Sequence, residues 1–124
     1  MDRKYILTSL SYAVLGLSLG IYMAASQNHE QHVTHAHIML VGFVVSFIYA
    51  LLHKLWLNNI HSRLANIQFY LHQLGSFVLF IGLFLLYGEF IALDTIEPVL
   101  AFASILVFIG MITMLMIYLK SKNT

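Results

Sequence analysis

Long apolar stretches alternate with short polar segments along the whole chain. The apolar stretches cover residues 5–26, 34–57, 67–88 and 97–119. Each has about the 20 residues that an α-helix needs to cross the hydrocarbon core of a bilayer. Because only helices and closed barrels satisfy all their backbone hydrogen bonds in that core, we expect four transmembrane helices.

The composition agrees with this pattern. Of the 124 residues, 60% are hydrophobic and 9% are charged, and the mean hydropathy is +0.87. A soluble domain of this size cannot cover so much apolar surface. We therefore predict an all-α integral membrane protein, in which residues 1–124 form a single four-helix transmembrane domain.

Two positions in the sequence qualify the helix assignment. The start of the chain imitates a secretory signal, because MDRKY precedes the first apolar stretch and MAASQ follows it. The apolar part is longer than a usual signal core, so we expect the first helix to be retained. Pro98, the only proline, is predicted to begin the fourth helix, where its missing N–H is tolerated.

The charged residues predict an orientation in the membrane. All basic residues precede the first helix, separate the second from the third, or follow the fourth: Arg3, Lys4, Lys54, Arg63, Lys120 and Lys122. Glu30, Glu89, Asp94 and Glu97 fall on the other side. The positive-inside rule then makes both termini and the basic loop cytoplasmic, in an inner (plasma) membrane. A net charge of +1 gives no reason to expect a nucleic-acid partner.

Two histidines at the mouth of the second apolar stretch are the strongest candidates for chemistry. The segment THAHIMLVGF, residues 34–43, contains His35 and His37. At about 100° per residue, the two rings leave the helix about 200° apart and about 3 Å apart in height. The helix can therefore offer one nitrogen ligand to each of two neighbouring sites, and ionisable groups in an apolar span indicate a functional site.

One side of the second helix is small and polar. The residues within roughly 40° of His35 around the axis are Met39, Gly42, Ser46, Tyr49 and His53. Met39 and Gly42 are therefore candidate cofactor-binding residues near His35.

A second candidate site lies toward the cytoplasmic side. His72 is about five residues into the third helix, and its face holds Gly75, Leu79 and Gly82. These glycines suit either tight helix packing or the flat face of a porphyrin. His53 ends the second helix on the same side, so His53 and His72 form a conceivable inner site, with His53 as a secondary metal ligand.

A heme iron bound by His35 needs a second axial ligand at the same depth. His72 lies near the opposite surface of a core about 30 Å thick, and it is therefore too far away. The first, third and fourth helices offer no histidine on the outer side, and Met23 and Met39 are weak alternatives. The missing ligand predicts a second copy of the chain.

Several of these motifs resemble a known family. THAHIM resembles the start of the second helix of heme-copper oxidase subunit I, where a heme histidine is followed four residues later by methionine, here His35 and Met39. The H-x-H is similar to that of the family's tenth helix. HAHIMLVGF and the later YLHQLGSFVLFIGL resemble small four-helix proteins described as cytochrome c oxidase subunit I-like, over about residues 29–90.

The resemblance implies an assembly and a cofactor. Subunit I has three arcs of four helices, which a four-helix chain can rebuild as a homotrimer of twelve helices. Each junction would then hold a heme between His35 of one protomer and His37 of the next. Without cysteine, c-type attachment is excluded; non-covalent heme b fits best, and heme a stays open.

The sequence also departs from that family. The second helix has no His-x-x-x-Tyr and the third has no adjacent histidine pair, so the full heme-copper active-site set is missing. No Asp, Glu or Lys lies deep in a span to form a proton channel. We therefore predict electron transfer or an oxidase-related redox role, and leave open whether the chain is itself an oxidoreductase.

Two other functions remain open at this stage. A copper-binding, metal-handling membrane protein would use an outer cluster of histidines and methionines: His29, His32, His35, His37, Met23 and Met39. A structural subunit would place the histidines at lipid headgroups and bind neither heme nor metal. A Soret band in the purified protein separates heme binding from both.

Overall fold

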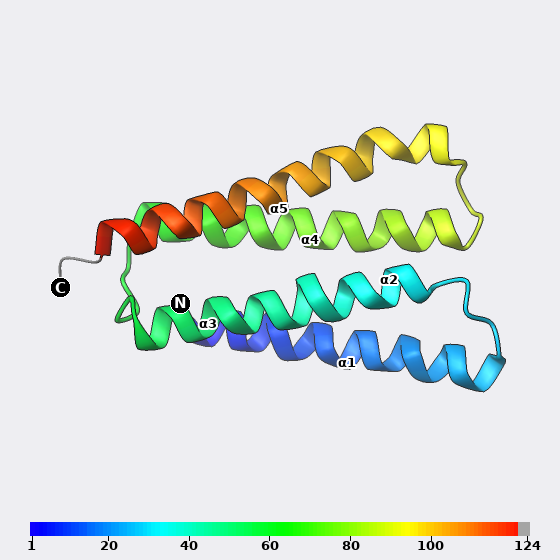
Figure 1. Ribbon diagram of the computed structural model, residues 1–124, viewed down its shortest axis with the longest axis horizontal. Helices are drawn as coiled ribbons and strands as arrows, with labels where there is room; N and C mark the ends of the chain where they lie inside the picture. The colour runs from blue at the N-terminus through cyan, green and yellow to red at the C-terminus, as the bar shows by residue number, and fades with distance from the viewer. Residues whose placement is uncertain (122–124) are drawn as a thin grey trace.

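The computed structural model describes residues 1–121 and consists of four long helical segments arranged as two hairpins (Figure 1). The segments are α1 (Asp2–Ser26); α2 (His32–His37), the π-helix η1 (Ile38–Val45) and α3 (Ser46–Leu55), which run on without a break; α4 (Arg63–Tyr87); and α5 (Leu93–Ser121). All four segments are long and apolar enough to cross a membrane, as predicted. Lys122, counted above among the basic residues, lies outside the described residues.

The helices begin two to four residues before the apolar stretches do. At the start of α4, the Ser62 hydroxyl accepts a hydrogen bond from the Ala65 backbone N–H at 3.0 Å, which caps the helix. The prediction that Pro98 begins the fourth helix is wrong, because α5 starts at Leu93 and contains it. The ring removes only the backbone bond to the Asp94 carbonyl, close to the helix start.

Close packing joins α4 to α5 within one hairpin. A Cβ added at Gly75 would lie 3.0 Å from the Ala103 carbonyl oxygen and 2.9 Å from Cβ of Leu106. A Cβ added at Gly82 would lie 2.7 Å from Leu100. The space beside both glycines of α4 is thus filled by α5 within the single chain, so helix packing accounts for these glycines.

The two hairpins pack through side chains in two clusters. Toward the chain termini, the buried aromatic residues Tyr5, Tyr49 and Phe69 pack with Met114 and Ile117 of α5. Toward the other end, Ile38 packs with Leu79, Phe80 and Leu83 of α4 and with Ala103.

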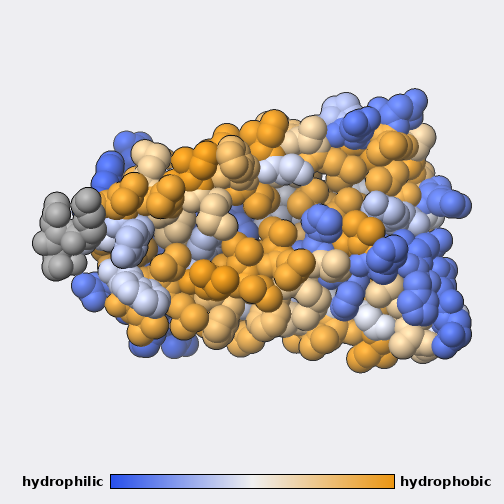
Figure 2. Space-filling model, viewed as in Figure 1, coloured by the Kyte–Doolittle hydropathy of each residue, from blue (hydrophilic) through white to orange (hydrophobic). Residues whose placement is uncertain are grey.

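The two ends of the bundle differ in charge. Both ends of the described chain and the loop 56–62 lie at one end, here called the basic end (Figure 1). The loops 27–31 and 88–92 lie at the opposite, acidic end, with Glu30 and Glu89. Figure 2 shows an apolar surface between the two hydrophilic ends, and side chains such as Leu7 are 69% exposed on it. This surface belongs to a multi-pass membrane protein.

Candidate functional site

His35 lies between α2 and α1. Its Nδ1 is 2.8 Å from the Gly16 carbonyl oxygen, and its ring covers Gly20, where an added Cβ would lie 3.0 Å from ring Cε1. Because a carbonyl only accepts hydrogen bonds, Nδ1 carries the hydrogen. This tautomer leaves the lone pair of His35 on Nε2, and the two glycines of α1 make room for the ring.

His37 has the same tautomer but leaves α2 on the other side. Its Nδ1 donates to the Val33 carbonyl oxygen one turn earlier, at 2.9 Å. Residues 32–37 are α-helical, so the rotation of about 100° per residue holds between the two histidines and sends their rings apart. A single chain therefore does not bring His35 and His37 to one metal.

Both histidines have the hydrogen bonding that is typical of metal ligands. A metal-bound histidine nearly always donates its other ring N–H to a carbonyl or carboxylate group, which fixes the tautomer and orients the ring. Each ring here is partly buried, is held through Nδ1, and has no hydrogen-bond partner at Nε2 in the described part of the chain. Both Nε2 atoms are thus prepared to bind a ligand.

The other candidates on the second helix are used in packing. The sulfur of Met39 packs against Gly16, next to the carbonyl that holds His35. Gly42 lies between two aromatic rings, since an added Cβ would be 2.8 Å from Cγ of Tyr12 and 3.0 Å from Phe80. Met39 and Gly42 both contact α1, as His35 does, and Gly42 also contacts α4.

The two outermost histidines, in the loop 27–31 and at the start of α2, stay at the surface. His29 and His32 are exposed, and His32 Nδ1 is 3.1 Å from the His29 carbonyl oxygen. Among residues 1–121, no three or more His, Asp or Glu side chains come together in a group that could hold a metal ion. The outer histidines do not gather around one ion within a single chain.

A buried polar cluster lies in the basic half of the bundle. The Tyr5 hydroxyl donates to Gln68 Oε1, and Gln68 Nε2 donates to the Gly110 carbonyl oxygen at 3.2 Å. His72 Nε2 is hydrogen-bonded to the Ser46 hydroxyl at 3.0 Å. These polar side chains are fully buried, and they come from α1, α3 and α4.

His53 and His72 both pack against Tyr5 in this cluster. The His53 ring stacks on Tyr5 with 5.8 Å between centroids, and the His72 ring lies 6.2 Å from Tyr5 and 5.0 Å from Tyr49. Neither nitrogen of His53 has a hydrogen-bond partner among the described residues. Nδ1 of His72 makes none of ordinary geometry either, although the Val41 backbone lies beside the ring. The pair considered from the sequence as an inner site is thus packed around a single tyrosine.

The sequence reasoning missed Tyr5, Gln68 and Ser76. A signal was present, because Gln68, His72 and Ser76 recur every four residues in a mostly apolar helix and therefore share one face. Tyr5 stands at the start of the first apolar stretch and is fully buried.

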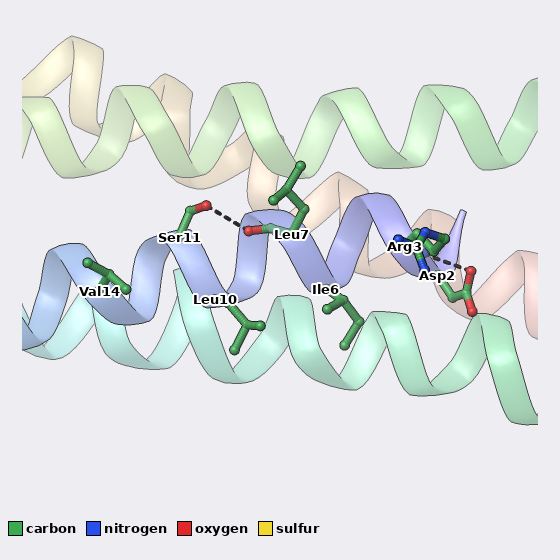
Figure 3. Close-up of a pocket in the computed structure, with 7 residues that line it drawn as sticks. All are labelled: Asp2, Arg3, Ile6, Leu7, Leu10, Ser11 and Val14. Atoms are coloured by element: carbon green, nitrogen blue, oxygen red, sulfur yellow. Dashed lines mark hydrogen bonds between the residues drawn. The ribbon is translucent and has the colours of Figure 1, made fainter.

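Two grooves on the surface of the described residues contain no histidine. An open groove of about 460 Å³ is lined by α1 alone, from Asp2 to Val14; Figure 3 shows the residues that line it. Ser11 in this groove donates to the Leu7 carbonyl oxygen of its own helix at 2.7 Å, so its hydroxyl is satisfied facing lipid. A second groove, of about 390 Å³, lies between α1, α2 and α4 and is lined mainly by apolar side chains such as Phe80.

The fold and its buried and half-buried histidines define a four-helix, multi-pass membrane protein with donor groups inside its spans. No family model, no curated protein and no solved structure matches the chain. Its function is therefore argued from the geometry of these sites and from the sequence resemblance.

Proposed function

We propose that the chain is a heme b-binding membrane protein that transfers electrons, assembled as a homotrimer resembling a minimal heme-copper oxidase subunit I. Each heme is held at a junction between two copies, by His35 of one copy and His37 of the next. The inner (plasma) membrane is its location, with the basic end in the cytoplasm by the positive-inside rule.

The observation that carries this proposal is the state of the two rings. Both are anchored through Nδ1 to backbone carbonyls, at 2.8 Å and 2.9 Å, and neither Nε2 has a hydrogen-bond partner within residues 1–121. They leave one helix in opposite directions at one depth, so a bis-histidine site requires two copies of the chain. THAHIM and its resemblance to the heme helix of subunit I supply the nature of the cofactor.

The residues present suit a heme held by two imidazoles. When bound, heme supplies one-electron redox chemistry, and the protein controls it through the axial ligands and the surrounding dielectric. His35 and His37 would hold the iron, and the Gly16 and Val33 carbonyls would orient the two rings. Both histidines lie in the second half of α2 and are partly buried, and apolar side chains of the same span, such as Leu40, are exposed.

Heme fits this arrangement better than copper. A copper site built from the outer histidines needs their side chains to come together, and the described residues form no group of three or more His, Asp or Glu side chains in one chain. A bis-histidine heme needs only one ring from each of two copies. Copper binding by the oligomer is the outcome that would replace this proposal.

Removing each histidine in turn tests the proposal. In detergent-purified protein, His35→Ala and His37→Ala should each abolish the low-spin Soret spectrum and the heme content in a pyridine hemochrome assay. His61→Ala, in the exposed loop at the basic end, is the matched control and should keep both. Wild-type protein that contains stoichiometric copper and no heme would contradict the proposal.

A further inference from the structure

Three fully buried side chains in the basic half of the bundle carry polar atoms without partners. These atoms are both ring nitrogens of His53, Nδ1 of His72 and Oγ of Ser76. Buried polar groups are nearly always hydrogen-bonded, and in a membrane they have no bulk water to turn to. Each of these four atoms therefore needs a partner that the described residues do not supply.

The chemistry of these atoms identifies the kind of ligand. A neutral imidazole has one N–H donor and one acceptor nitrogen, so His53 needs a partner of each kind. Ser76 likewise can donate and accept. A metal ion binds only lone pairs and would leave the His53 N–H unpaired, whereas water supplies both a donor and acceptors.

The cluster begins close to the basic end. The Asn59 backbone N–H donates to the His53 carbonyl oxygen at 2.7 Å, and the Asp2 backbone N–H donates to Asn59 Oδ1 at 3.1 Å. His53 is therefore within one helical turn of the loop 56–62. From His53 the cluster continues past the Tyr5 ring to His72 and then, one turn deeper, to Ser76.

We propose that this cluster is a hydrated site, in which water that enters from the basic end hydrogen-bonds to His53, His72 and Ser76. One water accepts a hydrogen bond from the N–H of His53, and another donates one to its second ring nitrogen. Water likewise pairs with Nδ1 of His72 and with Oγ of Ser76.

The residues packed around the two imidazoles supply no partner for the free atoms. Tyr5 of α1 packs against both rings, and Tyr49 of α3 packs against His72. From α5, the Gly110 backbone packs against His72. The proposal does not depend on heme.

Hydrogen–deuterium exchange at the imidazole C2 positions tests the hydrated site. In the full-length protein in detergent, exchange followed by mass spectrometry should label His53 and His72 within about tenfold of the rate at exposed His61. In Ser76→Ala the exchange at His72 should slow, because one anchor for the water is lost. Ser11→Ala, which faces lipid, is the matched control and should leave every rate unchanged.

Two results would overturn the inference. A dry site predicts that both buried rings are protected by about a thousandfold or more relative to His61, in wild type and in Ser76→Ala alike. If the site binds a metal instead, the protein should contain stoichiometric copper or zinc. Exchange at both rings should then be slow and should become faster when a chelator removes the metal. Neither result concerns His35 and His37, so the heme proposal is tested separately.

Discussion

Backbone carbonyl groups orient the two histidine rings on which the proposed heme site depends. His35 and His37 could be chosen from the sequence as candidate ligands, because ionisable side chains in an apolar stretch are conspicuous. The acceptors at Gly16 and Val33 carry no sequence signal, since every residue has a carbonyl group. The His35 ring also fills the space beside Gly20 of α1.

Gly20→Ala is expected to weaken heme binding at the residue scale. The new Cβ would lie 3.0 Å from Cε1 of His35 and would push the ring away from its carbonyl anchor. Loss of such outer contacts costs about 10- to 100-fold in metal affinity, so a hemin titration of the apoprotein should show a weakening of about tenfold. Ser18→Ala, exposed on the same helix, should bind hemin as wild type does. Equal affinities for the two variants would contradict the role of the Gly20 space.

The second span shows what was predictable at the scale of an element. Its length and apolar character were correctly predicted, but residues 38–45 form a π-helix where the sequence indicated an ordinary α-helix. The wider turn rotates the polar side of the span, so that Gly42 contacts α1 and α4 while Ser46 and Tyr49 reach His72 on α4. The π-helical turn depends on packing against other helices, and the periodicity of one helix carries no information about that packing. π-turns are frequent at functional sites.

Gly42→Ala tests that packing. The added methyl group would lie 2.8 Å from Cγ of Tyr12 and 3.0 Å from Phe80, both ring atoms in a packed interface. Overpacking of this kind typically costs about 1–3 kcal/mol, so we expect a lower unfolding midpoint in detergent. Gly110→Ala is the matched control: its nearest neighbour, the His72 backbone nitrogen, is at 3.4 Å, an ordinary contact, so stability should be kept. A Gly42→Ala protein as stable as Gly110→Ala would contradict the packing described.

At the scale of the whole molecule, the number of spans followed from bilayer thickness alone, and all four were found. The pairing of α1 with the second span and of α4 with α5 did not follow from the sequence, because every span has apolar residues on most of its surface. The burial of Tyr5 with His53 and His72 followed from that pairing and was equally hidden. Charge segregation did predict which loops share an end of the bundle.

Complementation between two variants that do not bind heme tests the central claim, that one heme is bound by two chains. His35→Ala and His37→Ala chains, each with a different affinity tag, are co-expressed and purified through both tags in sequence. A junction is intact only where the His35 of one copy meets the His37 of the next, so random mixing should restore about one quarter of wild-type junctions before tag selection. The account predicts that the doubly purified oligomers regain a low-spin Soret spectrum that neither variant has alone. Mixed oligomers that stay free of heme, or a single variant that keeps the wild-type spectrum, would contradict it.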